Sequence, residues 1–173
     1  MDEKHNWILA ATKALQDAGS WTGRIHIQKL LFLMKEFGLG DPPFRFEIYH
    51  YGPYASTLDQ TIAEMEMDGL LEKQYRQPGY GASYSPVEDC CSKGPTRNLY
   101  ELVTPLANKL GDKRSKDLEL IATCVWVEKV EKERDAGKIV ARVKKLKPKY
   151  TDQQIESSLQ DARRIESQVA RAN

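Results

Sequence analysis

The sequence is short of cysteine and of long hydrophobic runs. Its 173 residues include 3 cysteines, Cys90, Cys91 and Cys124, without C-x-x-C spacing. This odd number fits reduced thiols better than a disulfide framework, so we expect a cytoplasmic protein. No apolar run reaches the length that spans a bilayer, and the start of the chain lacks the pattern of a signal peptide. We therefore expect neither secretion nor a membrane partner.

The charge is also nearly balanced, with 26 Lys and Arg against 25 Asp and Glu and a net charge of +1. This balance predicts no bulk attraction to nucleic acid, so an electrostatic footprint has to come from local clustering. One cluster stands out as a run of basic residues without an intervening acid: Lys138, Arg142, Lys144, Lys145, Lys147 and Lys149. This run could bind phosphate nonspecifically. It is at least as consistent with a solvated basic helix that pairs with the acidic segment before it.

Hydrophobic periodicity predicts a mainly α fold with a small β component. Residues 4–18 and 24–37 have helical spacing, and the second segment is apolar on nearly its whole circumference, which places it in the core. Residues 44–51 alternate like a strand that Gly-Pro closes. A helix is expected over 54–68, with proline at its start and Ser56 as its cap.

A β-hairpin is expected next. Residues 70–76 and 98–105 look like paired strands across a polar, Gly/Pro-rich insert at about 77–96, which we expect to pack poorly and to be mobile. The order helix, helix, strand, helix, hairpin is that of a winged helix-turn-helix, with the hairpin as the wing. We therefore predict a winged-helix-like core over residues 1–110 and a C-terminal helical extension over 111–173.

The extension contains further predicted helices. Residues 115–136 and 138–147 have helical apolar spacing, and the second of these segments ends before Pro148. Thr151 and Gln154 have the spacing of a capping box that begins a last helix.

The stretch EIYHYGPYAS, residues 47–56, is the candidate contact surface. Strand alternation predicts that Tyr49 and Tyr51 share one face and that His50 lies on the other. Tyrosine contributes a large contact area at low entropic cost and keeps a polar end. The polar stripe of the preceding helix is either a solvated, salt-bridged edge or part of this surface. The predicted partner-binding residues are Arg24, Gln28, Lys29, Tyr49, Tyr51, Gly52, Pro53 and Tyr54.

Signals for chemistry are weak. His50 and Ser56 invite a nucleophile and base interpretation, but an orienting acid is not evident and the G-x-S-x-G elbow is absent. The adjacent cysteines 90 and 91 do not have the spacing of a zinc site, and the histidines lie far from them in sequence. We therefore expect a protein that is not an enzyme, with no catalytic residues, no metal and no cofactor.

DNA binding is the alternative hypothesis. In a winged helix the third helix enters the major groove, and its side chains contact bases and phosphates. The segment 54–68 contains Asp59, Glu64, Glu66 and Asp68 and no Lys or Arg, so a duplex would repel it. A nucleic-acid partner, bound through the wing and the basic segment at 138–149, is therefore not favoured over a protein partner.

Three segments, in order, carry a resemblance to a known family: GRIHIQKLLFLMKEFG, FEIYHYGPYASTLDQTIAEMEMDGLL and LYELVTPLANKL. Over roughly residues 1–110 they resemble the YwgA-like family of bacterial and phage proteins, and more distantly the Panacea domain of SocA-type antitoxins and proteolytic adaptors. The sequence departs from the family where Ala55 precedes Ser56 and in its longer wing insert. The resemblance implies a winged-helix, antitoxin-like or regulatory protein that contacts a protein partner, such as a toxin or a protease component.

Overall fold

The computed structural model describes residues 2–171 and is mainly helical with a small β component, as the sequence predicts. The strands form two separate two-stranded sheets. The elements in chain order are α1 (Glu3–Asp17), α2 (Arg24–Glu36), β1 (Glu47–Tyr49), β2 (Gly52–Tyr54), α3 (Ser56–Met67), β3 (Leu71–Gln74), β4 (Ser83–Pro86), α4 (Gly94–Leu110), α5 (Ser115–Val125), the π-helical segment η1 (Trp126–Val130), α6 (Ala136–Leu146) and α7 (Asp152–Ala170). No helix among residues 2–171 has the length and apolar character needed to cross a bilayer.

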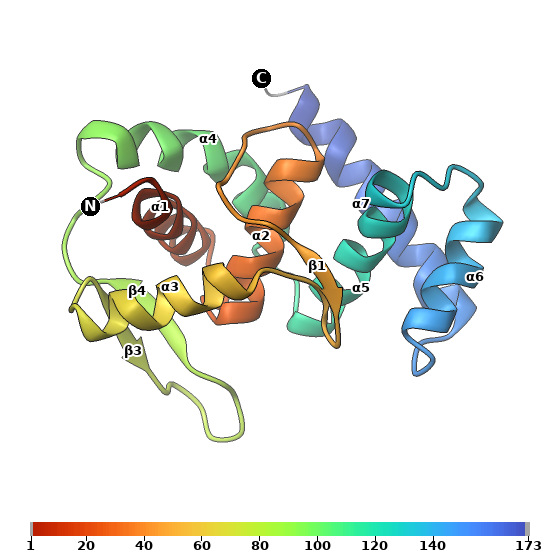
Figure 1. Cartoon of the computed structure of the whole chain (residues 1–173), viewed down its shortest axis with the longest axis horizontal. Helices are drawn as coiled ribbons and strands as arrows, with labels where there is room; N and C mark the ends of the chain where they lie inside the picture. Colours follow the sequence, from red (N-terminus) through yellow and green to blue (C-terminus); the bar gives the residue numbers. More distant parts are fainter. Residues whose placement is uncertain (1, 172–173) are drawn as a thin grey trace.

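Helix α2 is the central element of the fold. It lies between α1 on one side and α5 on the other (Figure 1). Every residue from His26 to Met34 is buried, which confirms the prediction from its nearly continuous apolar circumference.

The hydrophobic core has two parts. The main cluster joins α1, α2, α3 and α4 to the inner faces of α5 and α7, through residues such as Leu118 and Ile165. A smaller cluster lies between α5, α6 and α7, around Ile139, Val143 and Ile155. Side chains from both sides of residue 110 thus share the main cluster, so the C-terminal helices pack directly against the N-terminal part of the chain.

The strand predicted over 44–51 is the first half of a tight hairpin. Strand β1 pairs antiparallel with β2, and His50 and Tyr51 form the turn between them. Gly52 has a positive φ of 86°, which favours glycine at this chain reversal. Gly52 and Pro53 therefore begin a return strand and do not begin the following helix, contrary to the prediction.

The predicted cap at Ser56 is also wrong. Helix α3 begins at Ser56 itself, Ala55 occupies the N-cap position, and no side chain caps this helix. In contrast, Thr151 caps α7 in a capping box with Gln154, as predicted. The backbone N–H and carbonyl of Ala55 are both hydrogen-bonded to the buried side chain of Gln28 in α2, and Ala55 has the extended conformation of an N-cap.

The second hairpin pairs β3 with β4, and the strand predicted over 98–105 is wrong. That segment lies inside α4, which packs along α1. Its β-branched and aromatic residues favour a strand locally, but Val103, Leu106 and Leu110 recur at helical spacing and are all buried. Tertiary burial of this helical face decides the outcome.

The insert at 77–96 is better packed than its composition predicts, because it contains β4. Tyr84 of this strand is buried in the main core, and its backbone N–H donates to the carbonyl of Thr22 at 3.0 Å. The Thr22 hydroxyl donates to the carbonyl of Tyr84 at 2.6 Å. The exposed parts of the insert are therefore its loop up to Gly81 and the residues that follow β4, such as Val87 at 56% exposure.

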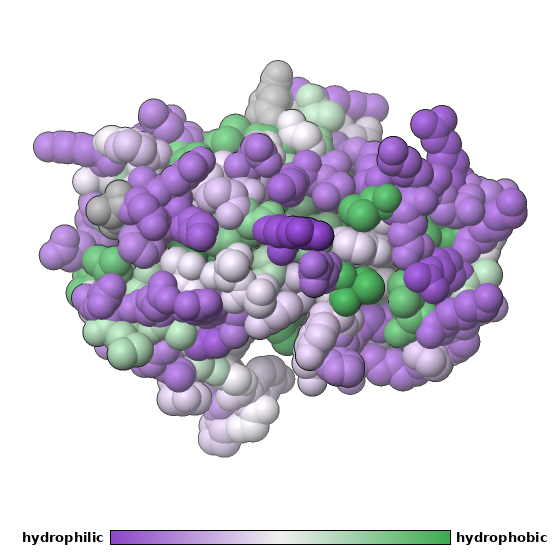
Figure 2. Space-filling model, in the orientation of Figure 1, coloured by the Kyte–Doolittle hydropathy of each residue, from purple (hydrophilic) through white to green (hydrophobic). Residues whose placement is uncertain are grey.

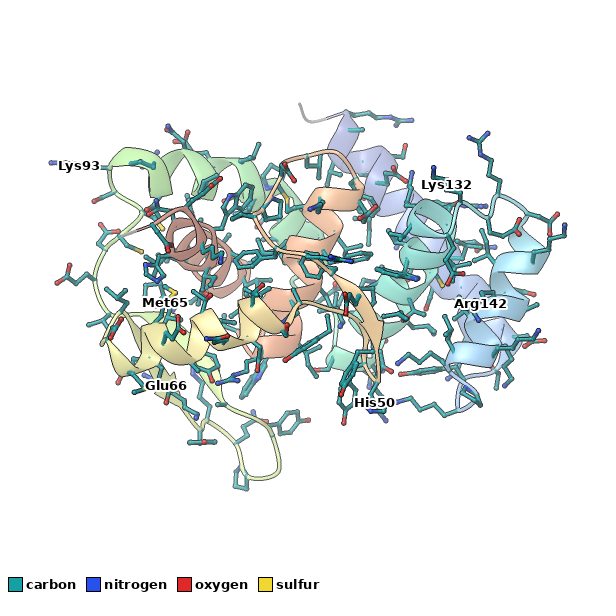
Figure 3. The ribbon with its side chains drawn as sticks, viewed as in Figure 1. His50, Met65, Glu66, Lys93, Lys132 and Arg142 are labelled. Carbon is teal, nitrogen blue, oxygen red and sulfur yellow. The ribbon has the colours of Figure 1, made fainter. Side chains whose placement is uncertain are left out.

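The helix predicted over 115–136 is shorter than expected. Helix α5 passes into η1, which ends at Val130. Lys132, labelled in Figure 3 at the connection to α6, has a φ of 60°. A right-handed helix cannot continue through a residue in this conformation, so the chain turns and starts α6.

Candidate functional site

The β1–β2 hairpin carries the predicted contact residues. It lies against α2 and α5 (Figure 1), and its side chains Tyr49 and Tyr51 are 62% and 58% exposed. The ring of Tyr49 stacks on Tyr54 with centroids 5.7 Å apart and meets His50 edge-on at 4.7 Å. Because His50 lies in the turn, strand alternation does not separate it from Tyr49, contrary to the prediction. The hairpin tip is thus a small aromatic surface.

The side chain of Gln28, on α2, binds the backbone of the residue that follows β2. Its side-chain amide nitrogen donates to the carbonyl of Ala55, and its amide oxygen accepts from the N–H of Ala55, both at 2.9 Å. The side chain therefore acts as a backbone partner for the residue that follows β2. Gln28 is buried, so water cannot pair with the N–H and the carbonyl of Ala55 here, and the side chain of Gln28 pairs with both.

Lys29 binds the hairpin one residue along α2. Its Nζ donates to the carbonyl of Pro53 at 2.7 Å, and the residue is only 1% exposed. A Cβ atom at Gly52 would lie 2.8 Å from Oγ1 of Thr123 on α5, so the hairpin backbone approaches α5 too closely for any side chain at this position. Helices α2 and α5 together fix the hairpin.

A buried carboxylate, Glu119 of α5, connects this region to the C-terminal helices. Nζ of Lys147 lies 2.9 Å from its Oε1, Nζ of Lys149 lies 3.5 Å from its Oε2, and the hydroxyl of Tyr150 donates to it at 3.2 Å. Lys147 also donates to the carbonyl of His50 in the hairpin turn. Figure 3 shows His50 at the hairpin tip, on the side that faces α6. The tip is therefore held from two directions.

Burial changes the acidity of this cluster. It lowers the pKa of Lys29 to about 7; the nearby Lys147 acts in the same direction, and the attraction of Glu119 opposes both. Burial and the Glu119 carboxylate raise the pKa of Tyr150 to about 12. A lysine with such a pKa suits nucleophilic or base chemistry. Here, however, Nζ of Lys29 is buried and donates a hydrogen bond to the carbonyl of Pro53, so the side chain supports the hairpin.

The predicted contact residues thus divide into two groups. Tyr49 and Tyr51 are exposed, and Arg24 and Tyr54 are half-buried. The other four do not lie on the surface, in contrast to the prediction, because they form or bind the inner side of the hairpin: Gln28, Lys29, Gly52 and Pro53.

Arg24 lies away from the hairpin tip, at the other end of the polar stripe of α2. It pairs with Asp59 of α3 at 2.8 Å, and its Nε donates to the hydroxyl of Tyr84 at 3.0 Å. It therefore ties α2 to α3 and β4.

The basic segment is partly used inside the fold. Lys147 is buried on Glu119, Lys144 donates to the carbonyls of Pro148 and Tyr150, and Arg142 makes two hydrogen bonds of 3.0 Å to Glu131. Figure 3 shows Arg142 on α6. Lys138, Lys145 and Lys149 are exposed, although Lys149 also faces Glu119.

Sequence reasoning missed Glu119 and Tyr150 as parts of this cluster. The available signal was a single acid, Glu119, within an otherwise apolar run from Leu118 to Val125. A lone acid on a buried helix face requires a cationic partner, and the lysine run supplies it.

Among residues 2–171, no group of three or more His, Cys, Asp or Glu side chains is placed to hold a metal ion. In comparisons with known proteins, no family model matches this sequence and no curated protein shows significant similarity to it.

Proposed function

We propose that this chain is a non-enzymatic, winged-helix-type interaction protein that binds a protein partner through the tip of the β1–β2 hairpin. The observation that carries the proposal is the exposure of Tyr49 and Tyr51 on a hairpin whose backbone is bound from below by Gln28 and Lys29. Aromatic side chains on a pre-organised backbone lose little entropy when a partner covers them, which is the property of interface hot spots.

The resemblance to the YwgA-like family supports a regulatory or antitoxin-like role for this contact, with a toxin or a protease component as the class of partner. The three free cysteines fit the reducing cytoplasm in which such a role would be exercised. A base and nucleophile role for His50 and Ser56 has less support, because the described residues give His50 a ring contact with Tyr49 and no orienting acid.

DNA binding through the wing and the basic segment is the second proposal, and it has less support. The acidic helix α3 opposes a duplex, and Lys147 is withdrawn from the surface by its contact with Glu119. The remaining exposed lysines suit only nonspecific phosphate contact, which weakens steeply as salt rises.

Affinity capture from the source organism tests the proposal when three tagged proteins are compared. We expect the wild type and Met67→Ala to retain the same partner, and Tyr51→Ala to bind that partner about tenfold or more weakly once it is purified. Met67 is the matched control because it is an 87% exposed apolar side chain on α3, outside the hairpin.

Thermal unfolding of the three proteins provides the control for folding, because Tyr51 and Met67 are both exposed and neither substitution should change the melting temperature. Full retention of the partner by Tyr51→Ala would contradict the proposal. Capture of nucleic acid alone, lost at high salt, would favour the DNA-binding alternative.

A further inference from the structure

A cleft of about 580 Å³ lies between the β3–β4 hairpin and the first residues of α2 and α5, apart from the β1–β2 hairpin. This volume is within the usual range of small-molecule sites. The surface in Figure 2 is hollowed where the β3–β4 loop projects away from the body of the molecule. The cleft walls combine aromatic and basic side chains, which restricts the chemistry of a ligand.

One wall of the cleft is aromatic. The rings of Trp21 and Tyr80 lie 5.8 Å apart at an interplanar angle of 47°, and Tyr80 is 64% exposed. Tyr75, on the same loop, also lines the cleft and is exposed. Exposed rings of this kind offer faces on which a planar heterocycle stacks.

The cleft is also basic. Arg24, Lys113 and Arg114 line it from the helical side, and Lys73 of β3 lines it from the hairpin, where its Nζ lies 5.7 Å from the centre of the Tyr75 ring; the only carboxylate in the lining is that of Asp112. Helix α5, which has 11 residues, begins beside Arg114, so its N-terminal backbone dipoles also face this side. The lining therefore favours an anion.

Three of the four cations are loosely held by their present partners. Arg24 is firmly paired with Asp59 at 2.8 Å. The other ion pairs are longer: 3.5 Å for Lys73 with Glu66, 3.6 Å for Lys113 with Asp161, and 3.5 Å for Arg114 with Asp117. Loose pairs near the surface contribute little to stability, so these cations remain available to a ligand.

The deep part of the cleft contains an unsatisfied group. His26 lines the cleft, is 2% exposed, and has no hydrogen-bond partner at either ring nitrogen. Burial lowers the pKa of His26 to about 4, weakly opposed by the backbone of Lys113, so the ring is neutral at pH 7. A neutral imidazole presents one donor and one acceptor; apart from the weak interaction with the backbone of Lys113 they are unpaired, and an unpaired buried polar group is costly. A polar ligand group that reached this depth would pair with the ring.

We propose that this cleft binds a nucleoside phosphate. The base stacks against the wall made by Trp21 and Tyr80, and the phosphate lies by Arg114 and the beginning of α5. This site is independent of the protein contact proposed for the β1–β2 hairpin, because none of the residues that line the cleft belongs to that hairpin.

Calorimetric titration of the full chain with ADP, adenosine and inorganic phosphate tests the proposal. We expect ADP to bind, and adenosine and phosphate each to bind about tenfold or more weakly, because each keeps only one of the two contacts. Tyr80→Ala and Arg114→Gln should each weaken ADP binding by about tenfold, through lost stacking and lost charge. Both side chains are exposed, so neither change should prevent folding.

Lys93→Gln is the matched control, because Lys93 is an exposed cation at the start of α4, far from the cleft in Figure 3. It should leave ADP binding unchanged. The proposal is overturned if ADP does not bind, if phosphate alone binds as tightly as ADP, or if Tyr80→Ala and Arg114→Gln bind like the wild type. Binding of a single-stranded oligonucleotide without binding of ADP also overturns it, in favour of a nucleic-acid surface.

Discussion

The two hairpins of this protein are held in opposite ways. The β1–β2 hairpin rests on two helices, and three buried side chains, Gln28, Lys29 and Lys147, bind its backbone. The β3–β4 hairpin is anchored at its base, through the hydrogen bonds between Thr22 and Tyr84, while its loop is exposed. The first hairpin is held at its turn and at the end of its return strand, and the second has a fixed base and an exposed tip. This contrast fits a rigid contact surface on one and a ligand cleft on the other.

The support of the first hairpin has an energetic cost. Taking Glu119, Lys147 and Lys29 out of water costs several kcal/mol per ion, and the mutual attraction of the charges only partly offsets it. A buried ion pair therefore adds little net stability, whereas the loss of one partner leaves an uncompensated buried charge and is strongly destabilising. The second hairpin is held by the neutral hydrogen bonds between Thr22 and Tyr84, by the buried ring of Tyr84, and by the half-buried Arg24, whose Nε donates to the Tyr84 hydroxyl, so no fully buried charge holds it. Substitutions should therefore affect the two hairpins by different amounts.

The largest effect is expected for Glu119→Leu. This change leaves Lys147 and Lys29 buried without their counter-charge, so the free energy of unfolding should fall by about 3–5 kcal/mol. Urea unfolding measures the loss.

The double variant Glu119→Leu with Lys147→Met is the control for this prediction. It removes the charges of Glu119 and Lys147 and leaves only Lys29 without its counter-charge, so part of the lost stability should return, although Lys147→Met also removes the hydrogen bond to the carbonyl of His50. If the two substitutions proved strictly additive, the charge cluster would not support the hairpin as described.

A pH effect of intermediate size is expected from Lys29. Its pKa is lowered from 10.5 to about 7 in the folded chain, so between these values the unfolded chain binds more protons. The free energy of unfolding should therefore rise as pH increases from about 7 to about 10.5, and this contribution is lost as pH falls to 7.

The comparison with Lys29→Met isolates this contribution, because other groups titrate in the same range. The difference in stability between wild type and variant should change with pH across this window. A constant difference from pH 7 to pH 10 would show that Lys29 has an ordinary pKa in the folded protein, and that the inner side of the hairpin is less enclosed than described.

The smallest effect is expected at the second hairpin. Thr22→Val keeps the shape of the side chain but removes the hydroxyl that donates to Tyr84, which should lower the free energy of unfolding by about 1–2 kcal/mol. The control is Thr12→Val, because Thr12 is also buried but donates only within its own helix, to Ile8. An equal loss in both variants would argue against a specific anchor at Thr22.

Sequence periodicity was informative where apolar spacing and local capping signals agreed over a few turns. The helix predicted over 24–37 and the capping box at Thr151 are confirmed, because both depend on spacing within a few residues. The error at 98–105 has the opposite cause. There, residue types that favour strands stand within a longer helical repeat that only packing against α1 reveals. Local propensity is a weak guide when burial favours another structure.

The candidate site was only half predictable. The aromatic tip could be predicted because tyrosines in a turn-forming stretch are a local signal. The roles of Gln28 and Lys29 could not, because their partners are the backbone groups of Pro53 and Ala55, more than twenty residues away. A polar side chain on a helix looks solvated until the element that covers it is known.

The sequence by itself determined the helical class of this protein, its central helix and its exposed tyrosines, since these follow from hydrophobic spacing and residue chemistry over short ranges. Only the tertiary structure decided which polar residues are buried, because each of those depends on a distant partner. Lys147 lies ninety-seven residues from His50, yet it binds that turn while it neutralises Glu119. A lysine that looks like part of a nucleic-acid patch along the chain thus becomes an internal support, because a buried carboxylate in the folded chain requires a cation beside it.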